Sequence, residues 1–236
     1  MKGNTVIKIG GSLLFNEKNE IDRNKIAKFC KICGAKKEEG RIIIVCGGGL
    51  LARDFIDVIR FFNGSEALCD IFGIEISRMN AKLLIACFQE CAYPQVPKSV
   101  EELSIALLFN KIIVMGGLQP GQSTTSVALE VAEFIHAERL IILTDVDGIY
   151  NMDPKKFNDA KLLKRVNYDQ LQEILLNVKE KTQAAAGEYR IFDIVSLQIL
   201  KRSDINVMIM SGTDLNNFNR FWDGEKGIIG TEISKE

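Results

Sequence analysis

The chain has 236 residues, of which 47% are hydrophobic and 26% charged, a balance typical of a globular enzyme with one sizeable core. Its 30 basic and 31 acidic side chains give a net charge of −1, so no overall positive field favours binding to nucleic acid or to a membrane surface. No apolar run is long enough for a secretion signal or a membrane span, and we therefore expect a cytoplasmic protein.

Short runs rich in β-branched residues alternate with amphipathic stretches along the chain. The runs predict strands at 5–9, 41–46, 111–115, 140–144 and 206–210. The amphipathic stretches predict helices at 22–38, 50–62, 70–92, 97–109, 123–136, 168–179 and 190–202. Because the strands are apolar almost throughout, they should be covered on both faces. The pattern predicts an α/β protein, a three-layer αβα sandwich with a mainly parallel central sheet.

The six cysteines raise the question of a metal or redox site. Cys30 and Cys33 form a CxxC pair, but both share one apolar helix face with Ile26, and the sequence has no second CxxC pair. We therefore predict that these thiols pack in the core as small hydrophobic groups, and we interpret Cys87 and Cys91 in the same way.

Four predicted strands end in loops that suit anion binding, at 8–12, 46–49, 115–124 and 143–148. Glycine lets a ligand approach the backbone closely, and a following helix offers unpaired N–H groups. In an open α/β sheet, ligands bind outside the carboxyl ends of the strands, so these loops should lie together. None matches the Walker A or the G-x-G-x-x-G pattern, which disfavours an ordinary P-loop ATPase and an ordinary dehydrogenase.

Two cations accompany these loops. Lys8 lies within an apolar strand, where its charge is costly unless it reaches an anion or solvent. Arg53 follows the triple glycine by one helical turn and can reach back over it, unless it simply faces solvent. His136, the only histidine, is remote from every glycine loop, so we expect neither a His-centred triad nor a His-rich metal site. Phosphoryl transfer requires charge neutralisation and positioning, which these loops could supply.

Five motifs make the chain resemble the amino-acid-kinase superfamily and, within it, the archaeal type of uridylate (UMP) kinase. They follow the family's order along nearly the whole chain: K-I-G-G-S at 8–12, G-G-G-x-x-A-R at 47–53, D-x-x-G-I-x-x-S-R-M-N-A at 70–81, G-G-L-Q-P-G-Q-S-T at 116–124 and T-D-V-D-G-I-Y-N-M-D-P-K at 144–155.

The resemblance implies transfer of the γ-phosphoryl group of ATP to UMP in pyrimidine nucleotide synthesis, with Mg²⁺ bridging the phosphates. Because Mg²⁺ often keeps few protein ligands, we assign it no residue. The resemblance further implies a homohexamer. Each chain would be a single amino-acid-kinase-like domain over 1–236, with an acceptor-binding lobe at about 1–135 and an ATP-binding lobe at about 136–236.

The resemblance also assigns residues, with Lys8 as the catalytic residue that faces the transferred group. The ATP site would comprise Lys8, Ile9, Gly10, Gly11, Ser12, Gly49, Arg53, Thr144, Asp145, Tyr150 and Asp153. The UMP site would comprise Gly48, Asp70, Gly117, Leu118, Gln119, Pro120, Gly121, Gln122, Ser123 and Thr124.

Some of these positions have other interpretations. Asp70 could be the N-cap of the helix that follows, and Asp145 could stabilise the turn before Gly148. Backbone N–H groups with Arg53 or Arg78 could hold the phosphate of the acceptor.

The chain departs from the family pattern at two places that bear on the site. Thr125 stands where many UMP kinases carry Asp. At 193–196, D-I-V-S replaces the family's D-P-L-A, and the loss of proline relaxes the start of that helix.

Three other functions stay open. Isopentenyl phosphate kinase and N-acetylglutamate kinase share the fold, but they usually carry His where this chain has Cys46. The acceptor could nevertheless be CMP or isopentenyl phosphate. The chain could also be a non-catalytic nucleotide-binding or oxyanion-binding protein on the same scaffold.

Overall fold

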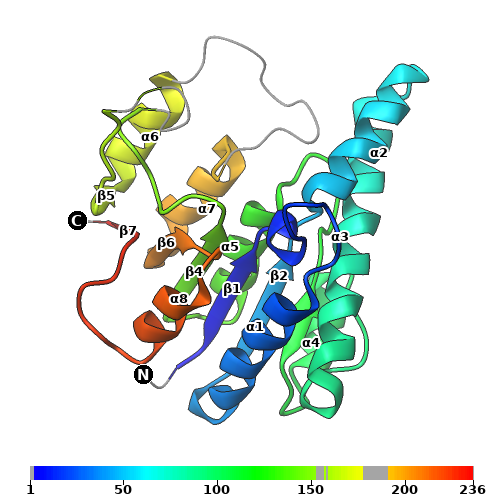
Figure 1. The fold of residues 1–236 in the computed structure, drawn as a ribbon, viewed down its shortest axis with the longest axis horizontal. Helices are drawn as coiled ribbons and strands as arrows, with labels where there is room; N and C mark the ends of the chain where they lie inside the picture. The colour runs from blue at the N-terminus through cyan, green and yellow to red at the C-terminus, as the bar shows by residue number, and fades with distance from the viewer. Residues whose placement is uncertain (1–2, 153–156, 158, 178–190, 236) are drawn as a thin grey trace.

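The structure is a computed structural model that describes residues 3–152, 157, 159–177 and 191–235. The strands of this part of the chain form one seven-stranded sheet in the order β3-β2-β1-β4-β6-β7-β5 (Figure 1). Their bounds are β1 (Thr5–Ile9), β2 (Ile42–Cys46), β3 (Ile113–Met115), β4 (Arg139–Thr144), β5 (Arg165–Asn167), β6 (Val207–Ser211) and β7 (Thr231–Ser234).

The first five strands of that order run parallel, which confirms the predicted α/β class. Strand β1 is the middle one of these five, with Lys8 in register between Val45 of β2 and Ile142 of β4. Strand β7 runs antiparallel to β6 and parallel to β5. The carboxyl ends of β1, β2 and β3 therefore lie at one edge of the sheet, where the glycine loops begin.

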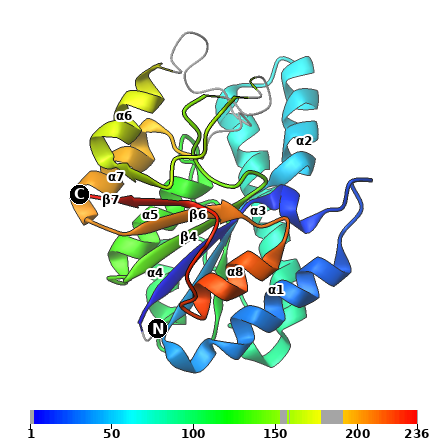
Figure 2. The same ribbon diagram turned by 60° about the vertical axis from the view of Figure 1, so that its left-hand side comes forward.

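Helices cover both faces of the sheet and give the three layers (Figure 2). Those described are α1 (Arg23–Ala35), α2 (Gly49–Phe61), α3 (Glu66–Phe88), α4 (Val100–Ala106), α5 (Thr124–Phe134), α6 (Tyr168–Asn177), α7 (Ile194–Ser203) and α8 (Leu215–Trp222). Alternate residues of β1 face opposite ways: Val6 packs with α4, α5, α6 and α7, while Ile7 and Ile9 pack with α1, α3 and α8. This double burial explains why the parallel strands are apolar throughout.

Three elements were not predicted from the sequence: β5, β7 and α8. Strand β5 has only three residues and β7 only four, and each carries a charged or polar residue at alternate positions. Helix α8 has the sequence LNNFNRFW and is only eight residues long. Its buried apolar residues are Leu215, Phe218 and Trp222. Such short segments carry too little periodicity to stand out, and their burial against the rest of the sheet stabilises them.

Two helices, α3 and α7, begin four residues away from their predicted starts. Helix α3 begins at Glu66, and Ser65 caps it by accepting a hydrogen bond from the Leu68 N–H at 3.2 Å. Asp70 lies inside the helix, so its interpretation as an N-cap is wrong. Helix α7 begins at Ile194, and Asp193 and Ser196 cap it reciprocally. The proline of the family pattern would have favoured a helix start here. In its absence, the capping box defines the start of α7.

The cysteines are all free. Cys33 is fully buried and Cys30 nearly so, which confirms the predicted core packing, and burial raises the pKa of both thiols. Cys87 is only half-buried and Cys91 is exposed in a short turn after α3, so for Cys91 the prediction was wrong. Over the described ranges no helix is both long and apolar enough to cross a membrane.

A buried threonine of β7 forms hydrogen bonds with the segment that follows β4. Thr231, at the start of β7, is fully buried. Its Oγ1 accepts a hydrogen bond from the Ile149 N–H at 2.8 Å and donates one to the Leu163 carbonyl at 2.6 Å. Both bonds join residues far apart in the sequence.

We expect Thr231→Val to lower the free energy of unfolding by about 1–3 kcal/mol, because valine keeps the shape but leaves a buried N–H without its partner. Thr213→Val is the matched control, since Thr213 is exposed, and it should change stability by less than about 0.5 kcal/mol. Urea denaturation of both variants measures the difference. Equal losses in the two variants would contradict the structural role of Thr231.

Candidate active site

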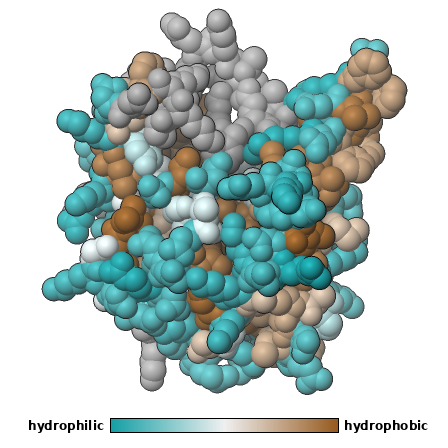
Figure 3. All heavy atoms as spheres, in the orientation of Figure 1, coloured by the Kyte–Doolittle hydropathy of each residue, from teal (hydrophilic) through white to brown (hydrophobic). Residues whose placement is uncertain are grey.

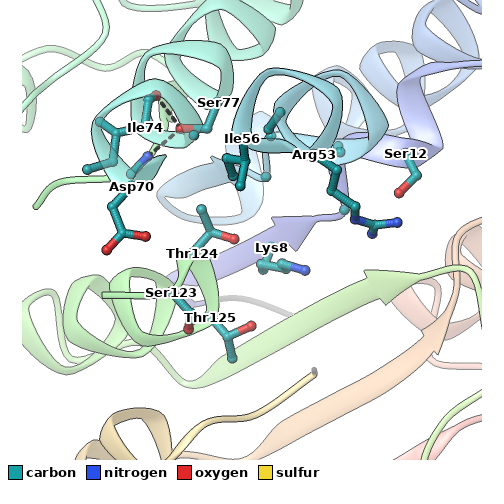
Figure 4. A pocket seen from close by; sticks show the side chains of 18 of the residues that line it. Lys8, Ser12, Arg53, Ile56, Asp70, Ile74, Ser77, Ser123, Thr124 and Thr125 are labelled. Atoms are coloured by element: carbon teal, nitrogen blue, oxygen red, sulfur yellow. Dashed lines mark hydrogen bonds between the residues drawn. The ribbon is translucent and has the colours of Figure 1, made fainter. Parts of the chain in front are cut away.

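The glycine loops after β1, β2 and β3 and the N-terminus of α5 enclose one cavity of about 210 Å³ (Figure 4). Residues from four separate stretches of the chain line it: Lys8, Gly10, Gly11, Ser12, Gly47, Gly48, Gly49, Ala52, Arg53, Ile56, Asp70, Gly73, Ile74, Ser77, Gly117, Gln122, Ser123, Thr124 and Thr125. The cavity lies outside the carboxyl ends of the strands, as expected for an open α/β sheet.

The loops after β1 and β2 touch at glycines. A Cβ atom on Gly11 would collide with backbone atoms of Gly47, Gly48 and Gly49. Gly49 has a φ of +73°, which residues with a side chain rarely adopt, and a Cβ there would collide with Gly11 in turn. Larger residues would therefore separate the two loops, so glycine is required for close packing at this wall of the cavity.

Helix α3 holds the loop after β2 through an amide side chain. Asn80 is nearly fully buried, and its Nδ2 donates hydrogen bonds to the Gly47 carbonyl at 2.8 Å and the Gly48 carbonyl at 3.2 Å. Because these two hydrogen bonds satisfy both carbonyls, they fix the position of the loop relative to α3.

The same helix also binds residues 117–122, which we call the acceptor loop after the role that the sequence predicts for it. The Ser77 Oγ accepts a hydrogen bond from the Gly117 N–H at 2.7 Å and donates one to the Ile74 carbonyl at 2.7 Å. About two turns earlier in α3, the Asp70 carboxylate accepts a hydrogen bond from the Gly121 N–H at 2.8 Å. Helix α3 is therefore a common support for two walls of the cavity.

Lys8 extends into the cavity from the central strand (Figure 4). It is the one residue of β1 that is only half-buried as a whole, although its ammonium group is enclosed by protein. Burial of its ammonium group lowers the pKa of Lys8 from its ordinary 10.5 to about 8; the Asp145 carboxylate opposes this shift and the Arg53 guanidinium adds to it. A poorly solvated ammonium beside a second cation is a strong binding point for an anion.

Arg53 and the N-terminus of α5 complete the positive part of the cavity. Arg53 extends from the second turn of α2 towards the space beside Lys8 (Figure 4). Ser123 caps α5 by accepting a hydrogen bond from the Ser126 N–H at 3.1 Å. The unpaired N–H groups of the first turn of α5 lie next to Thr124 and Thr125, at the dipole end that favours negative charge.

Most residues that the sequence predicted for the site do line this one cavity. From the predicted ATP site they are Lys8, Gly10, Gly11, Ser12, Gly49 and Arg53, and from the predicted UMP site Gly48, Asp70, Gly117, Gln122, Ser123 and Thr124.

The other predicted site residues lie elsewhere. Ile9 is buried in the core with α1, α3 and α8. Leu118, Gln119, Pro120 and Gly121 form the outer part of the acceptor loop.

The predicted residues after β4 also lie outside the cavity wall. Thr144 is the last residue of β4, and Asp145 follows it, near enough to influence Lys8. The Tyr150 hydroxyl donates to the Asp147 carboxylate at 3.4 Å. Asp153 lies outside the described residues.

Of the two arginines that the sequence left open for the phosphate of the acceptor, Arg78 is not favoured by its position. It is absent from the cavity wall, and its guanidinium donates instead to the backbone carbonyls of Gly117 and Leu118. Arg53 is therefore left as the arginine of the cavity.

Sequence reasoning assigned no ligand-binding role to several residues that line the cavity: Gly47, Ala52, Ile56, Gly73, Ile74, Ser77 and Thr125. The two isoleucines resemble ordinary core positions of amphipathic helices, so periodicity gives no signal for them. Gly73 and Ser77 belong to the motif at 70–81, whose fixed spacing is the signal that could have found them. Thr125 is almost fully buried beside the cavity, at the position where many UMP kinases carry Asp.

This arrangement of glycine loops, helix N-terminus and lysine defines an α/β protein that binds phosphate groups outside the carboxyl ends of its strands. A model of the amino acid kinase family matches residues 4–211. The chain belongs to the amino acid kinase family.

Relatives with known names support the family assignment. The chain is 40% identical over 228 residues to a uridylate kinase of Methanobrevibacter smithii, covering 97% of each chain. It is 40% identical over 197 residues to the uridylate kinase of Sulfolobus acidocaldarius, covering 83% of this chain and 85% of that one. The crystal structure of the uridylate kinase from Archaeoglobus fulgidus superimposes with a TM-score of 0.81 at 34% identity, over 99% of this chain and 100% of that one.

The low pKa of Lys8 has a consequence for stability. Between pH 8 and 10.5 the unfolded chain keeps a proton on Lys8 that the folded chain has lost. Compared with the Lys8→Met variant, the wild-type protein should therefore gain stability as the pH rises through this window. Urea denaturation of both proteins at several pH values measures the difference. A stability difference that does not change with pH, or that changes in the opposite direction, would contradict the burial of this ammonium group.

Proposed function

We propose that this chain is a uridylate kinase, which transfers the γ-phosphoryl group of ATP to UMP and releases UDP and ADP. The observation that carries the proposal is the position of Lys8, a poorly solvated cation where glycine loops and the N-terminus of α5 meet. The names of the relatives, identical at 36–40%, indicate the same reaction.

The two substrates would approach Lys8 from opposite sides. ATP would bind with its phosphates along Lys8–Ser12, Gly49 and Arg53 and with its nucleoside towards Thr144, Asp145, Tyr150 and Asp153. UMP would bind between α3 and the acceptor loop, with Gly48, Asp70 and residues 117–124 around it. All of these acceptor residues thus belong to the lobe at about 1–135, and the nucleoside of ATP would contact the lobe at about 136–236.

The chemistry needs no protein nucleophile. An oxygen of the UMP phosphate would attack the γ-phosphorus in line, a new P–O bond would form, and the bond to the β,γ-bridging oxygen would break. Negative charge spreads over the transferring group in the transition state, where Lys8, Arg53 and the N-terminus of α5 would stabilise it. Because the UMP phosphate is already an anion at neutral pH, no general base is required.

Magnesium fits this cavity as an ion carried by the nucleotide. Of the residues lining the cavity, the only carboxylate belongs to Asp70, which already accepts a hydrogen bond from Gly121. Backbone amides, hydroxyls and cations make up the rest, a set that binds phosphate oxygens better than a bare cation. When bound, Mg²⁺ would neutralise charge on the phosphates that it bridges.

The free, mostly buried cysteines suit a reducing compartment, from which we infer a cytoplasmic enzyme.

The exposed apolar side chains of α2 and α3 support a homohexamer. We call them the α2–α3 surface, and they include Phe55, Val58, Phe61, Phe62, Ile71, Phe72 and Met79. Figure 3 shows apolar residues at the outer end of α2. The rings of Phe55 and Phe72 stack across the two helices with centroids 6.1 Å apart.

A second exposed apolar group lies on and after α4, at Ile105, Leu108 and Phe109. A closed ring of dimers needs two different contact surfaces per chain, and these two groups could supply them.

The kinase reaction is tested by incubating the protein with ATP, Mg²⁺ and one acceptor at a time: UMP, CMP or isopentenyl phosphate. We expect UDP and ADP in equal amounts with UMP. Preferential phosphorylation of CMP or isopentenyl phosphate would keep the reaction class and change the substrate. Nucleotide binding without a phosphorylated product would instead favour a non-catalytic binding protein.

Substituting the catalytic lysine gives a sharper test. Lys8→Ala should lower kcat by roughly 10²-fold or more with a much smaller effect on equilibrium binding of UMP, because its charge matters most in the transition state. Lys31→Ala is the control, since Lys31 is exposed on α1, and its kcat should match the wild type. Steady-state kinetics and calorimetry measure the two effects. An unchanged kcat in Lys8→Ala would mean that another cation stabilises the transferring group.

The hexamer is tested by light scattering after gel filtration. The wild-type protein should have six times the mass of one chain. The double variant Phe61→Glu, Phe62→Glu should form smaller species, because it places charges on two side chains that are 81% and 72% exposed on the α2–α3 surface. Ile229→Glu, which is exposed away from both apolar groups, should remain hexameric. A double variant of unchanged mass would remove the α2–α3 surface from the assembly.

A further inference from the structure

The proposed reaction requires two phosphate groups to lie in a fixed relation inside one cavity. An oxygen of the acceptor's phosphate must be in line with the bond that breaks in ATP, and small displacements lower the rate steeply. Lys8 and Arg53 extend into the same space (Figure 4), but both are long side chains that can follow a phosphate that moves. The relative position of the two phosphates must therefore be set by a more rigid part of the cavity.

The triple-glycine loop after β2 carries backbone groups that suit this task. Gly48 and Gly49 both line the cavity, and within the described part of the chain their N–H groups donate to no acceptor. The same is true of the N–H groups of Gly11 and Ser12 after β1. The Gly49 nitrogen lies so close to Gly11 that a Cβ atom on Gly11 would collide with it. The two loops thus bring N–H groups together at one wall, where phosphate oxygens can accept from them.

Asn80 of α3 sets the direction of two of these N–H groups. A trans peptide unit is planar, and its C=O and the N–H that follows point to opposite sides; the described residues include no cis peptide bond. The Asn80 Nδ2 donates to the Gly47 carbonyl at 2.8 Å and to the Gly48 carbonyl at 3.2 Å. The first carbonyl shares its plane with the Gly48 N–H, and the second shares its plane with the Gly49 N–H. One amide group therefore orients two successive peptide planes.

The loop needs such a group because glycine peptides rotate more freely than any others. The amide of Asn80 carries two protons, so it can hold both carbonyls at the same time. Asn80 is only 4% exposed, which shields these hydrogen bonds from competing water. It also lies on the 23-residue helix α3, so the loop is held against a rigid element.

The two oriented N–H groups serve different substrates in the proposed reaction. The Gly48 N–H faces the acceptor's phosphate and the Gly49 N–H faces the phosphates of ATP, following the roles that the sequence predicts for these glycines. Since Asn80 holds both peptide planes, a shift of one N–H group is coupled to a shift of the other.

We propose that Asn80 is a positioning residue that aligns the phosphate of the acceptor with the γ-phosphoryl group of ATP, by holding the carbonyls of Gly47 and Gly48. The inference rests on the proposed kinase function and deepens it. Among the described residues, those that line the cavity do not include Asn80, so it acts through the loop and touches neither substrate.

The test compares Asn80→Leu with the wild type, because leucine keeps nearly the same shape but donates no hydrogen bond. Its kcat should fall by about tenfold or more. Equilibrium binding of UMP alone, and of a non-hydrolysable ATP analogue alone, should each weaken by less than about threefold. The reason is that a released peptide can still turn to meet a single phosphate, whereas the joint alignment of two phosphates is lost. Steady-state kinetics and calorimetry measure the two effects.

Tyr168→Phe is the matched control. It also removes a buried side-chain donor from a backbone carbonyl, that of Ile205 at 3.2 Å, but neither residue lines the cavity. Its kcat should match the wild type, and thermal unfolding of both variants shows that each assay is run on folded protein. Asn80→Ser, whose single hydroxyl proton can serve only one carbonyl, should give an intermediate kcat and replaces Asn80→Leu if that variant does not fold.

Two results would overturn the inference. One is a wild-type kcat in folded Asn80→Leu. The other is a loss that lies wholly in the binding of the single substrates, with no fall in kcat, which would reduce Asn80 to a structural support of the wall.

The failure of the inference and that of the proposed function are distinguishable. A wild-type protein that phosphorylates UMP, together with an Asn80→Leu variant of equal kcat, is a kinase whose alignment has another origin. A wild-type protein that phosphorylates no acceptor overturns the proposed function, and the inference with it.

Discussion

Helix α3 is the element that fixes the geometry of the cavity, because it hydrogen-bonds two loops that are far apart in the sequence. Asn80 binds the carbonyls of the loop after β2, while Ser77, Arg78 and Asp70 bind the acceptor loop after β3. All four side chains come from one helix, whose spacing is rigid. The distance between the two loops is therefore set by α3, and the close contact of Gly11 with Gly47–Gly49 can form on that support.

The hydrogen bonds from α3 and the nearby cations together determine the electrostatic character of the cavity. Asn80 and Arg78 bind backbone carbonyls of the two loops, and Lys8, Arg53 and the N-terminus of α5 add positive charge. A protein of net charge −1 thus has one strongly anion-selective cavity. The charge is local, which agrees with a small phosphorylated substrate better than with a long polyanion.

The motif at 70–81 shows how far sequence reasoning reached and where it stopped. Its resemblance to a family motif identified the stretch, and Asp70 does line the cavity. The sequence could not show that Ser77, Arg78 and Asn80 hold loops, because their hydrogen-bond partners lie 32–40 residues away. It also placed the start of the helix too late, because the Ser65 cap precedes a stretch without clear amphipathic spacing. The sequence did not predict strands β5 and β7, because burial in the tertiary structure stabilises them rather than a hydrophobic pattern of their own.

The sequence by itself determined the parallel core strands, the glycine loops at their ends and Lys8 as the cation among them. These features follow from local periodicity, backbone freedom at glycine and the cost of a charge in an apolar strand. Only the tertiary structure decided which loops share one cavity, that Ile56 and Ile74 form part of its wall, and that Arg78 binds carbonyls and no ligand. The physical reason is that these outcomes depend on contacts between distant segments, and hydrophobic periodicity along the chain carries no information about which distant groups will pair.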